Sequence, residues 1–230
     1  MSTAYHNQVL RILKTDGAVC RAVIGRCSGA PRTGFLRSHF DSTACVPDSK
    51  KSLNALLYQS ISSGVLLVEP TTLKIERLLP GPIDRVWAYL TQSDLRRRWL
   101  ASGEMRLAPD APFELVWRND ELSDPPGHRP EGFSEEDRMA SRIITVIPPH
   151  RLVFSWGEGG EVSIELQALG KDVLLTLVHR RLANRKTRLE VGAGWHAHLD
   201  ILAARLQEKE PKPFWDSWLG LKEEYEHRIP

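Results

Sequence analysis

The sequence has few cysteines, no long apolar run and little excess charge, and each of these features excludes a class of protein. Its three cysteines, Cys20, Cys27 and Cys45, form no CxxC pair, and their odd number argues against a closed disulfide framework. No apolar run reaches the length of a membrane span, and no signal-peptide pattern stands at the start. We therefore expect a cytoplasmic protein with no membrane span.

Signatures of common chemistries are also missing. The net charge is +2 over 230 residues, which gives no indication of a nucleic-acid partner. There is no GxSxG, no P-loop and no GxGxxG before a βα pattern, so hydrolase and nucleotide-binding sites have no support. Three glutamates, Glu114, Glu161 and Glu165, lie on the polar faces of predicted strands. They therefore give no support to catalysis by a pair of carboxylates. We expect no metal and no cofactor.

The composition changes near residue 70. All three cysteines come before it, and all seven tryptophans come after it. Residues 25–50 mix Gly, Pro, Ser, Thr and Arg with little periodicity, which is typical of loop or disorder. We therefore expect a poorly structured or mis-annotated leader over residues 1–70, a folded domain over 71–210, and a C-terminal helical tail over 211–230 that packs on the domain.

Three interpretations of the leader remain open. A gene start placed too early would produce a segment of unrelated composition before the domain. An organelle transit peptide would explain why the first 40 residues hold one acid, Asp16, among several Arg and Ser. Alternatively, helical spacing from Leu53 to Ile61 would allow that segment to dock on the domain as an extra helix.

The chain after residue 71 has the pattern of an α+β domain. Alternation of apolar and polar residues predicts strands in TTLKIERLL, FELVWR, SRIITVI, RLVFSW, EVSIELQAL and DVLLTLVHRRL. Helical spacing predicts short helices in PIDRVWAYLT and SDLRRRWLA, a long helix from Gly192 to Glu208, and a further helix in the tail. The arginines of DLRRRW are expected on an exposed helix face. We expect a curved antiparallel sheet wrapped around the long helix.

The two histidines of the long helix are expected to differ in environment. Trp195, Leu199, Leu202 and Leu206 form one apolar stripe at helical spacing, and His198 borders it. His196 points away from the stripe and is placed to pair with Asp200 on a solvated face. Two histidines at i and i+2 diverge on a helix, so they cannot chelate one metal ion.

Five phrases in order resemble a known superfamily. They are PIDRVWAYLT, DLRRRWL, PPHRLVFSW, LTLVHRRL and GAGWHAHLDILAARL, and they resemble the SRPBCC superfamily, whose START-like or Bet v-like fold is the helix-grip fold. More narrowly, they are similar to its heat-shock-protein-90 ATPase activator-like branch. The resemblance covers about residues 72–227. It implies a hollow between the curved sheet and the long helix that holds an apolar or amphipathic small molecule.

The candidate site residues are mostly aromatic. Those for a cavity wall are Trp99, Phe113, Trp117, Trp156, Trp195 and Leu202, with His179 and His198 as polar anchors. Ordinary core packing is the alternative for each aromatic residue, and a buried ring bonded to backbone is the alternative for each histidine.

Three functions remain open at this point. The first is binding of an apolar small molecule, as in a stress-related accessory protein. The second is a cyclase-like enzyme that uses His179 and His198 as acid and base. The third is a module that contacts a chaperone, or a second copy of the chain, through its surface.

Overall fold

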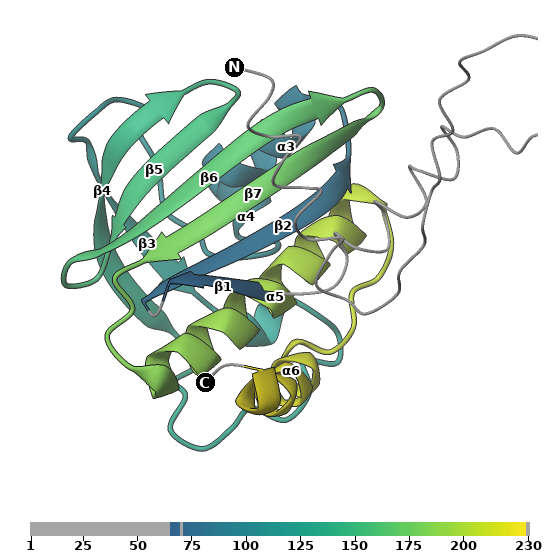
Figure 1. Cartoon of the computed structure of the whole chain (residues 1–230). Helices are drawn as coiled ribbons and strands as arrows, with labels where there is room; N and C mark the ends of the chain where they lie inside the picture. The colour runs from purple at the N-terminus through teal and green to yellow at the C-terminus, as the bar shows by residue number, and fades with distance from the viewer. Residues whose placement is uncertain (1–64, 70, 229–230) are drawn as a thin grey trace, which may run out of the picture. The chain divides into compact units, whose positions relative to one another are not determined.

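The fold is an α+β arrangement of one antiparallel sheet and a long helix (Figure 1). A computed structural model describes residues 65–69 and 71–228. The strands are β1 (Val65–Glu69), β2 (Thr72–Pro80), β3 (Pro112–Trp117), β4 (Asp137–Ile147), β5 (Arg151–Trp156), β6 (Gly160–Leu169) and β7 (Asp172–Arg180). The helices are α3 (Ile83–Thr91), α4 (Ser93–Arg96), the 3-10 turn η1 (Asn119–Glu121), α5 (Arg185–Leu206) and α6 (Phe214–Arg228).

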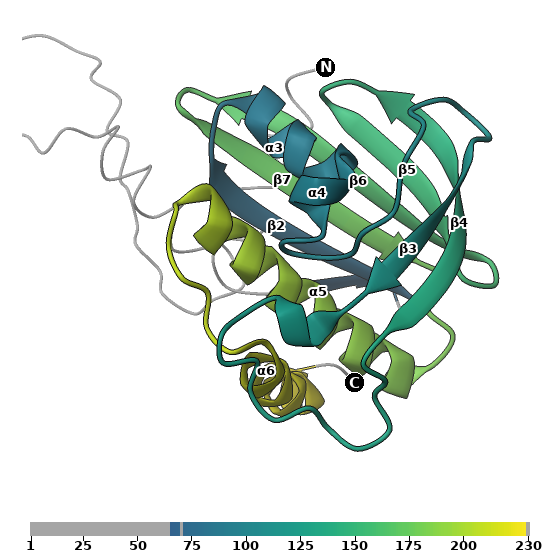
Figure 2. The same ribbon diagram turned by 180° about the vertical axis from the view of Figure 1, so that it is seen from behind.

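The seven strands lie in the order β1-β2-β7-β6-β5-β4-β3, and every neighbouring pair is antiparallel. Strands β3 to β7 follow one another as hairpins, whereas the chain crosses from β2 to the opposite edge through α3 and α4. Figure 2 shows α3 over the β6–β7 part of the sheet and α5 running beside β2. The predicted helix-grip fold is confirmed.

The predicted alternation of side chains appears in the strands that face α5. In β2, Leu73, Ile75 and Leu79 are fully buried, and Lys74 and Glu76 are only partly covered. The same phase in β7 buries Val173, Leu175, Leu177 and His179. These apolar side chains form the core between the sheet and α5, since alternate residues of a strand point to one face.

The sheet begins earlier than the sequence pattern indicated. Strand β1 pairs with β2, with Leu66 opposite Lys74, so the expected boundary at residue 70 falls inside this hairpin. Residues 1–64 lie outside the described residues. The three interpretations of the leader concern these residues, so they stay predictions.

Helix α5 also begins earlier than predicted, at Arg185 rather than Gly192. The side-chain oxygen of Asn184 accepts a hydrogen bond from the backbone N–H of Thr187 at 2.9 Å, which caps the first turn. The helix is covered on two sides rather than along one stripe. A Cβ at Gly192 would be in van der Waals contact with Leu73 of β2 and with Tyr225 of α6, so helix α5 separates these two elements.

The predicted exposure of His196 is wrong because α6 covers this part of α5. Its side chain is 12% exposed, and its Nδ1 shares a hydrogen bond of 2.6 Å with the Tyr225 hydroxyl. The predicted contact with Asp200 is present, at 3.5 Å from Nε2. Burial, together with the charges of Arg77 and Arg228, lowers the pKa of His196 to about 3. The ring is therefore neutral in the folded protein.

The expectation that the DLRRRW arginines are all exposed is also wrong for Arg96. Arg97 and Arg98 are exposed, whereas Arg96 is 2% exposed. The Arg96 guanidinium donates hydrogen bonds to the backbone carbonyls of Leu90, Thr91, Ala101 and Gly103. Arg96 therefore holds the end of α3 against the segment that leads to β3, and burial lowers its pKa to about 10.

Candidate functional site

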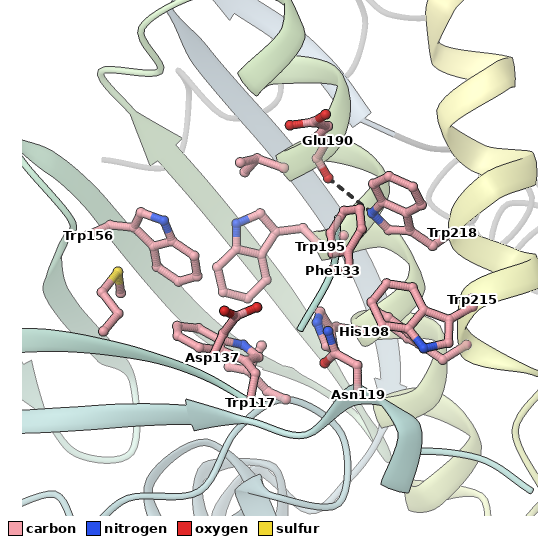
Figure 3. A pocket seen from close by; sticks show the side chains of 15 residues that line it. Trp117, Asn119, Phe133, Asp137, Trp156, Glu190, Trp195, His198, Trp215 and Trp218 are labelled. Atoms are coloured by element: carbon pink, nitrogen blue, oxygen red, sulfur yellow. Dashed lines mark hydrogen bonds between the residues drawn. The ribbon is translucent and has the colours of Figure 1, made fainter. Parts of the chain in front are cut away.

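A cavity of about 340 Å³ lies between α5, α6 and the β3–β5 part of the sheet (Figure 3). Seven of its lining side chains are aromatic, namely Trp117, Phe133, Trp156, Trp195, Phe214, Trp215 and Trp218. The other lining residues are Leu100, Asn119, Asp137, Met139, Glu190, Val191, Gly194 and His198. The cavity is therefore largely apolar, with a few polar groups in its wall.

Three tryptophans from different elements form one wall. Trp117 ends β3, Trp156 ends β5 and Trp195 lies on α5. The ring centroids of Trp117 and Trp156 are 5.5 Å apart, and those of Trp156 and Trp195 are 5.2 Å apart. Tilted and edge-to-face contacts of this kind are the favoured geometry of aromatic pairs, so the rings support one another around the hollow.

Residues of α6 and of the loop before β4 form the opposite wall. Phe133 makes edge-to-face contacts with Trp215 and Trp218, with ring centroids 5.1 Å apart in both pairs. The Nε1–H of Trp218 donates to the carbonyl oxygen of Glu190 at 3.3 Å, which joins α6 to α5 (Figure 3). The Nε1–H of Trp215 donates to Oδ1 of Asp120 at 2.6 Å. Both indoles are therefore fixed by a polar contact as well as by packing.

His179 lies behind this cavity rather than in its wall. Its Nδ1 accepts a hydrogen bond from the Nε1–H of Trp195 at 3.0 Å, and its ring packs against Trp156. Because an indole nitrogen can only donate, Nδ1 must be unprotonated. Burial lowers the pKa of His179 to about 4, which agrees with a neutral ring. His179 therefore orients Trp195.

His198 is part of the cavity wall and is also neutral. Its Nδ1 lies 2.8 Å from the carbonyl oxygen of Trp99, and a carbonyl only accepts, so Nδ1 carries the proton and Nε2 is left as an acceptor. Burial lowers the pKa of His198 to about 4, although the bond to Trp99 acts in the opposite direction. The ring also packs on Phe214, with centroids 4.8 Å apart.

Three further polar residues line the cavity. Oδ1 of Asn119 is buried and has no hydrogen-bond partner among the described residues. The carboxylate of Glu190 lies 3.9 Å from Lys186 and 3.8 Å from Lys222. Asp137 begins β4 directly opposite Trp117 of β3. The arrangement can bind a compact apolar molecule and accept hydrogen bonds from it.

Four of the eight residues selected from the sequence line this cavity, and four do not. Trp117, Trp156, Trp195 and His198 line it. Trp99, Phe113, Leu202 and His179 are buried outside it. Trp99 donates its Nε1–H to the Tyr89 carbonyl at 2.8 Å, and Phe113 packs on Phe154. The alternative of ordinary core packing therefore describes Trp99, Phe113 and Leu202.

The sequence reasoning missed the aromatic residues of α6 and of the loop. Phe214, Trp215 and Trp218 fall within the run FWDSW, whose density of aromatic residues was a usable signal. Phe133, in the loop between η1 and β4, had no pattern that could have placed it at the site.

The part of the chain that the structure describes contains no group of three or more His, Cys, Asp or Glu arranged to hold a metal ion. Among the described helices, none has the length and apolar character needed to cross a membrane.

Comparison with solved structures supports the fold. A protein of Bordetella parapertussis, solved by solution NMR, is 37% identical with a TM-score of 0.61, over 71% of this chain and 89% of that one. The crystal structure of CalU16 from Micromonospora echinospora is 23% identical with a TM-score of 0.52, over 69% and 88% of the two chains. A conserved protein of unknown function from Enterococcus faecalis is 17% identical with a TM-score of 0.55, over 76% and 95%. The last two comparisons concern the fold alone.

Family membership rests on a match to a family model. No match was found among curated proteins. The family model described as "Activator of Hsp90 ATPase homolog 1-like protein" matches residues 80–207, which is more than half of the chain. This confirms the predicted resemblance to the SRPBCC superfamily and to its heat-shock-protein-90 ATPase activator-like branch. The chain therefore belongs to the Activator of Hsp90 ATPase homolog 1-like family.

Proposed function

We propose that this protein binds a compact apolar or amphipathic small molecule in the cavity between α5, α6 and the sheet. One observation carries this function: seven aromatic side chains from strands, helices and a loop surround a single hollow of about 340 Å³. That volume lies at the lower end of the roughly 300–1,000 Å³ typical of small-molecule sites. His198 adds an acceptor that would orient a ligand donor.

The positions of the two histidines favour binding over the cyclase-like alternative. An acid and a base must both reach the reacting atoms, but His179 does not line the cavity and its Nδ1 is occupied by Trp195. His198 lines the cavity as a neutral acceptor, because its pKa is about 4. A ring of this kind orients a ligand but supplies no proton near neutral pH.

Filling the cavity tests the proposed site. Gly194 lines it on α5, and a Cβ there would lie 3.8 Å from the Trp218 indole nitrogen. Gly220 on α6 has open space around its Cβ position. Both are helical glycines, so Gly194→Leu and Gly220→Leu gain similar helix propensity. A fluorescence titration with the neutral apolar probe N-phenyl-1-naphthylamine would compare the two variants with the wild type.

We expect Gly194→Leu to lower the probe affinity by roughly tenfold or more through lost volume, and Gly220→Leu to leave it unchanged. Circular dichroism would show that both variants are folded. Equal probe binding by wild type and Gly194→Leu would place the binding site elsewhere. Native mass spectrometry of the purified protein would then show directly whether a small molecule is retained.

A further inference from the structure

The charged groups around the cavity are unevenly distributed. The residues that line it include two acids, Asp137 and Glu190, and the ring of His198, whose Nε2 is an acceptor. No Lys or Arg is among the lining residues in the described part of the chain. An anionic ligand would meet like charge at Asp137, whereas a cationic ligand would meet opposite charge there.

The two carboxylates differ in what already neutralises them. Glu190 has Lys186 and Lys222 within 4 Å. Asp137 has no side-chain hydrogen bond or ion pair to any residue that the structure describes.

The arginines nearest to Asp137 in sequence and in strand register form ion pairs with other carboxylates. Arg138 pairs with Glu136 and Glu114 at 2.7 and 2.8 Å, and Arg118 pairs with Glu136 at 2.7 Å. Asp137 is exposed, and its negative charge is not neutralised by either of these arginines.

Asp137 lies beside the wall of the cavity that the tryptophan rings form. It is directly opposite Trp117 in the β3–β4 ladder, and side chains at such paired positions lie on the same face of the sheet. Figure 3 shows its carboxylate on the side of the cavity that Trp117, Trp156 and Trp195 form. Tryptophan rings attract organic cations more strongly than other aromatic rings do. On the outside of the same site, Lys222 Nζ already lies 5.2 Å from the centroid of the Trp218 ring.

One acceptor restricts the ligand further. Nε2 of His198 can accept a hydrogen bond because Nδ1 holds the proton. An acceptor in an apolar cavity is stabilised by a donor. A ligand that carries a hydroxyl or an N–H group would supply that donor, whereas a pure hydrocarbon would not.

Resting on the proposed function, we infer that the cavity is selective for an aromatic organic cation that carries a hydroxyl or N–H donor. Its ammonium group lies beside Asp137 and over the tryptophan faces, and its donor meets Nε2 of His198. This assigns charge recognition to Asp137, and it defines a ligand class narrower than apolar molecules in general.

An isosteric pair of ligands tests the inference. (3-Hydroxyphenyl)trimethylammonium and 3-tert-butylphenol have the same shape and the same hydroxyl, and they differ only in charge. Each would be titrated against the full chain carrying N-phenyl-1-naphthylamine, with displacement of the probe as the signal. The variants are Asp137→Asn and, as a matched control, Glu136→Gln, whose carboxylate is outside the cavity and already paired with Arg118 and Arg138.

We expect the wild type to bind the cation about tenfold more tightly than the neutral phenol. Asp137→Asn should weaken the cation about five- to tenfold and change the phenol less than about twofold, and Glu136→Gln should change neither. Tighter binding of the phenol by the wild type, or equal loss of both ligands in Asp137→Asn, would overturn charge selectivity while the proposed function stands. Failure of the probe and both ligands to bind would overturn the two together.

Discussion

Three buried histidines make the stability of this domain sensitive to acid. His179, His196 and His198 have ordinary pKa values of 6.5 when exposed, and burial lowers these to about 4, about 3 and about 4. The folded protein therefore keeps all three rings neutral at a pH where the unfolded chain protonates them. Because the unfolded state then binds more protons, the free energy of unfolding falls as the pH drops below 6.5 and levels off near 4 to 3.

The expected size of the effect follows from the number of protons. Each such ring lowers the free energy of unfolding by up to about 1.4 kcal/mol per pH unit within its window. Between about pH 7 and about pH 5 the loss is roughly 2 kcal/mol per ring, or roughly 6 kcal/mol for three. Burial raises the pKa of Asp200, so protonation of this carboxyl offsets part of the loss at the acid end. Domains are typically stable by about 5–15 kcal/mol, so the effect is large.

Asparagine variants separate the contributions of the individual rings. His179→Asn can still accept from Trp195 through its carbonyl, and His198→Asn can still donate to the Trp99 carbonyl through its amide. Neither asparagine titrates. Urea unfolding at several pH values should give each variant a slope about 1.4 kcal/mol per pH unit shallower than the wild type in the window below pH 6.5. A wild-type free energy of unfolding that is flat across this window would refute the buried, neutral state of these rings.

Two further predictions concern the loop that leads to β3. Arg96→Lys should lower the free energy of unfolding by roughly 3 kcal/mol, because an ammonium group cannot donate to all four carbonyls that the guanidinium reaches. The exposed control Arg97→Lys should change the free energy of unfolding by less than about 0.5 kcal/mol. Similar urea midpoints for the two variants would contradict this prediction. Gly103 has a φ of +126°, and a Cβ there would collide with the carbonyl oxygen of Glu114, whereas Gly132 has a φ of +89° with open space around it. Gly103→Ala should therefore cost roughly 3 kcal/mol or more and Gly132→Ala about 1 kcal/mol, and equal melting temperatures would show that the Gly103 loop can move aside.

The sequence predicted the sheet well because its signal is local. Alternation in β7, with Val173, Leu175 and Leu177 inward, depends on the geometry of a single strand. The sequence pattern placed the start of α5 at Gly192, inside the helix, because the capping role of Asn184 was not recognised. Helix propensity is a weak signal that tertiary packing overrides.

The environment of single polar residues could not be predicted for a different reason. His196 faces away from the apolar stripe, as its spacing indicated, but α6 covers that side of α5 and supplies Tyr225 as a partner. Arg96 is buried because chain turns on both sides of α4 bring backbone carbonyls to its guanidinium. Both outcomes depend on how separate segments pack, which periodicity along one segment does not encode.

The residues matched by the family model do not include all of the cavity wall. The family match ends at residue 207, but Phe214, Trp215 and Trp218 of α6 form much of one wall. That wall is fixed at defined points, because Trp215 donates to Asp120, and Trp218 donates to the Glu190 carbonyl. In a hollow of about 340 Å³, replacing even one indole would change the shape and the faces offered to a ligand. Relatives that share residues 80–207 but differ after them would therefore have the same scaffold and a differently shaped cavity.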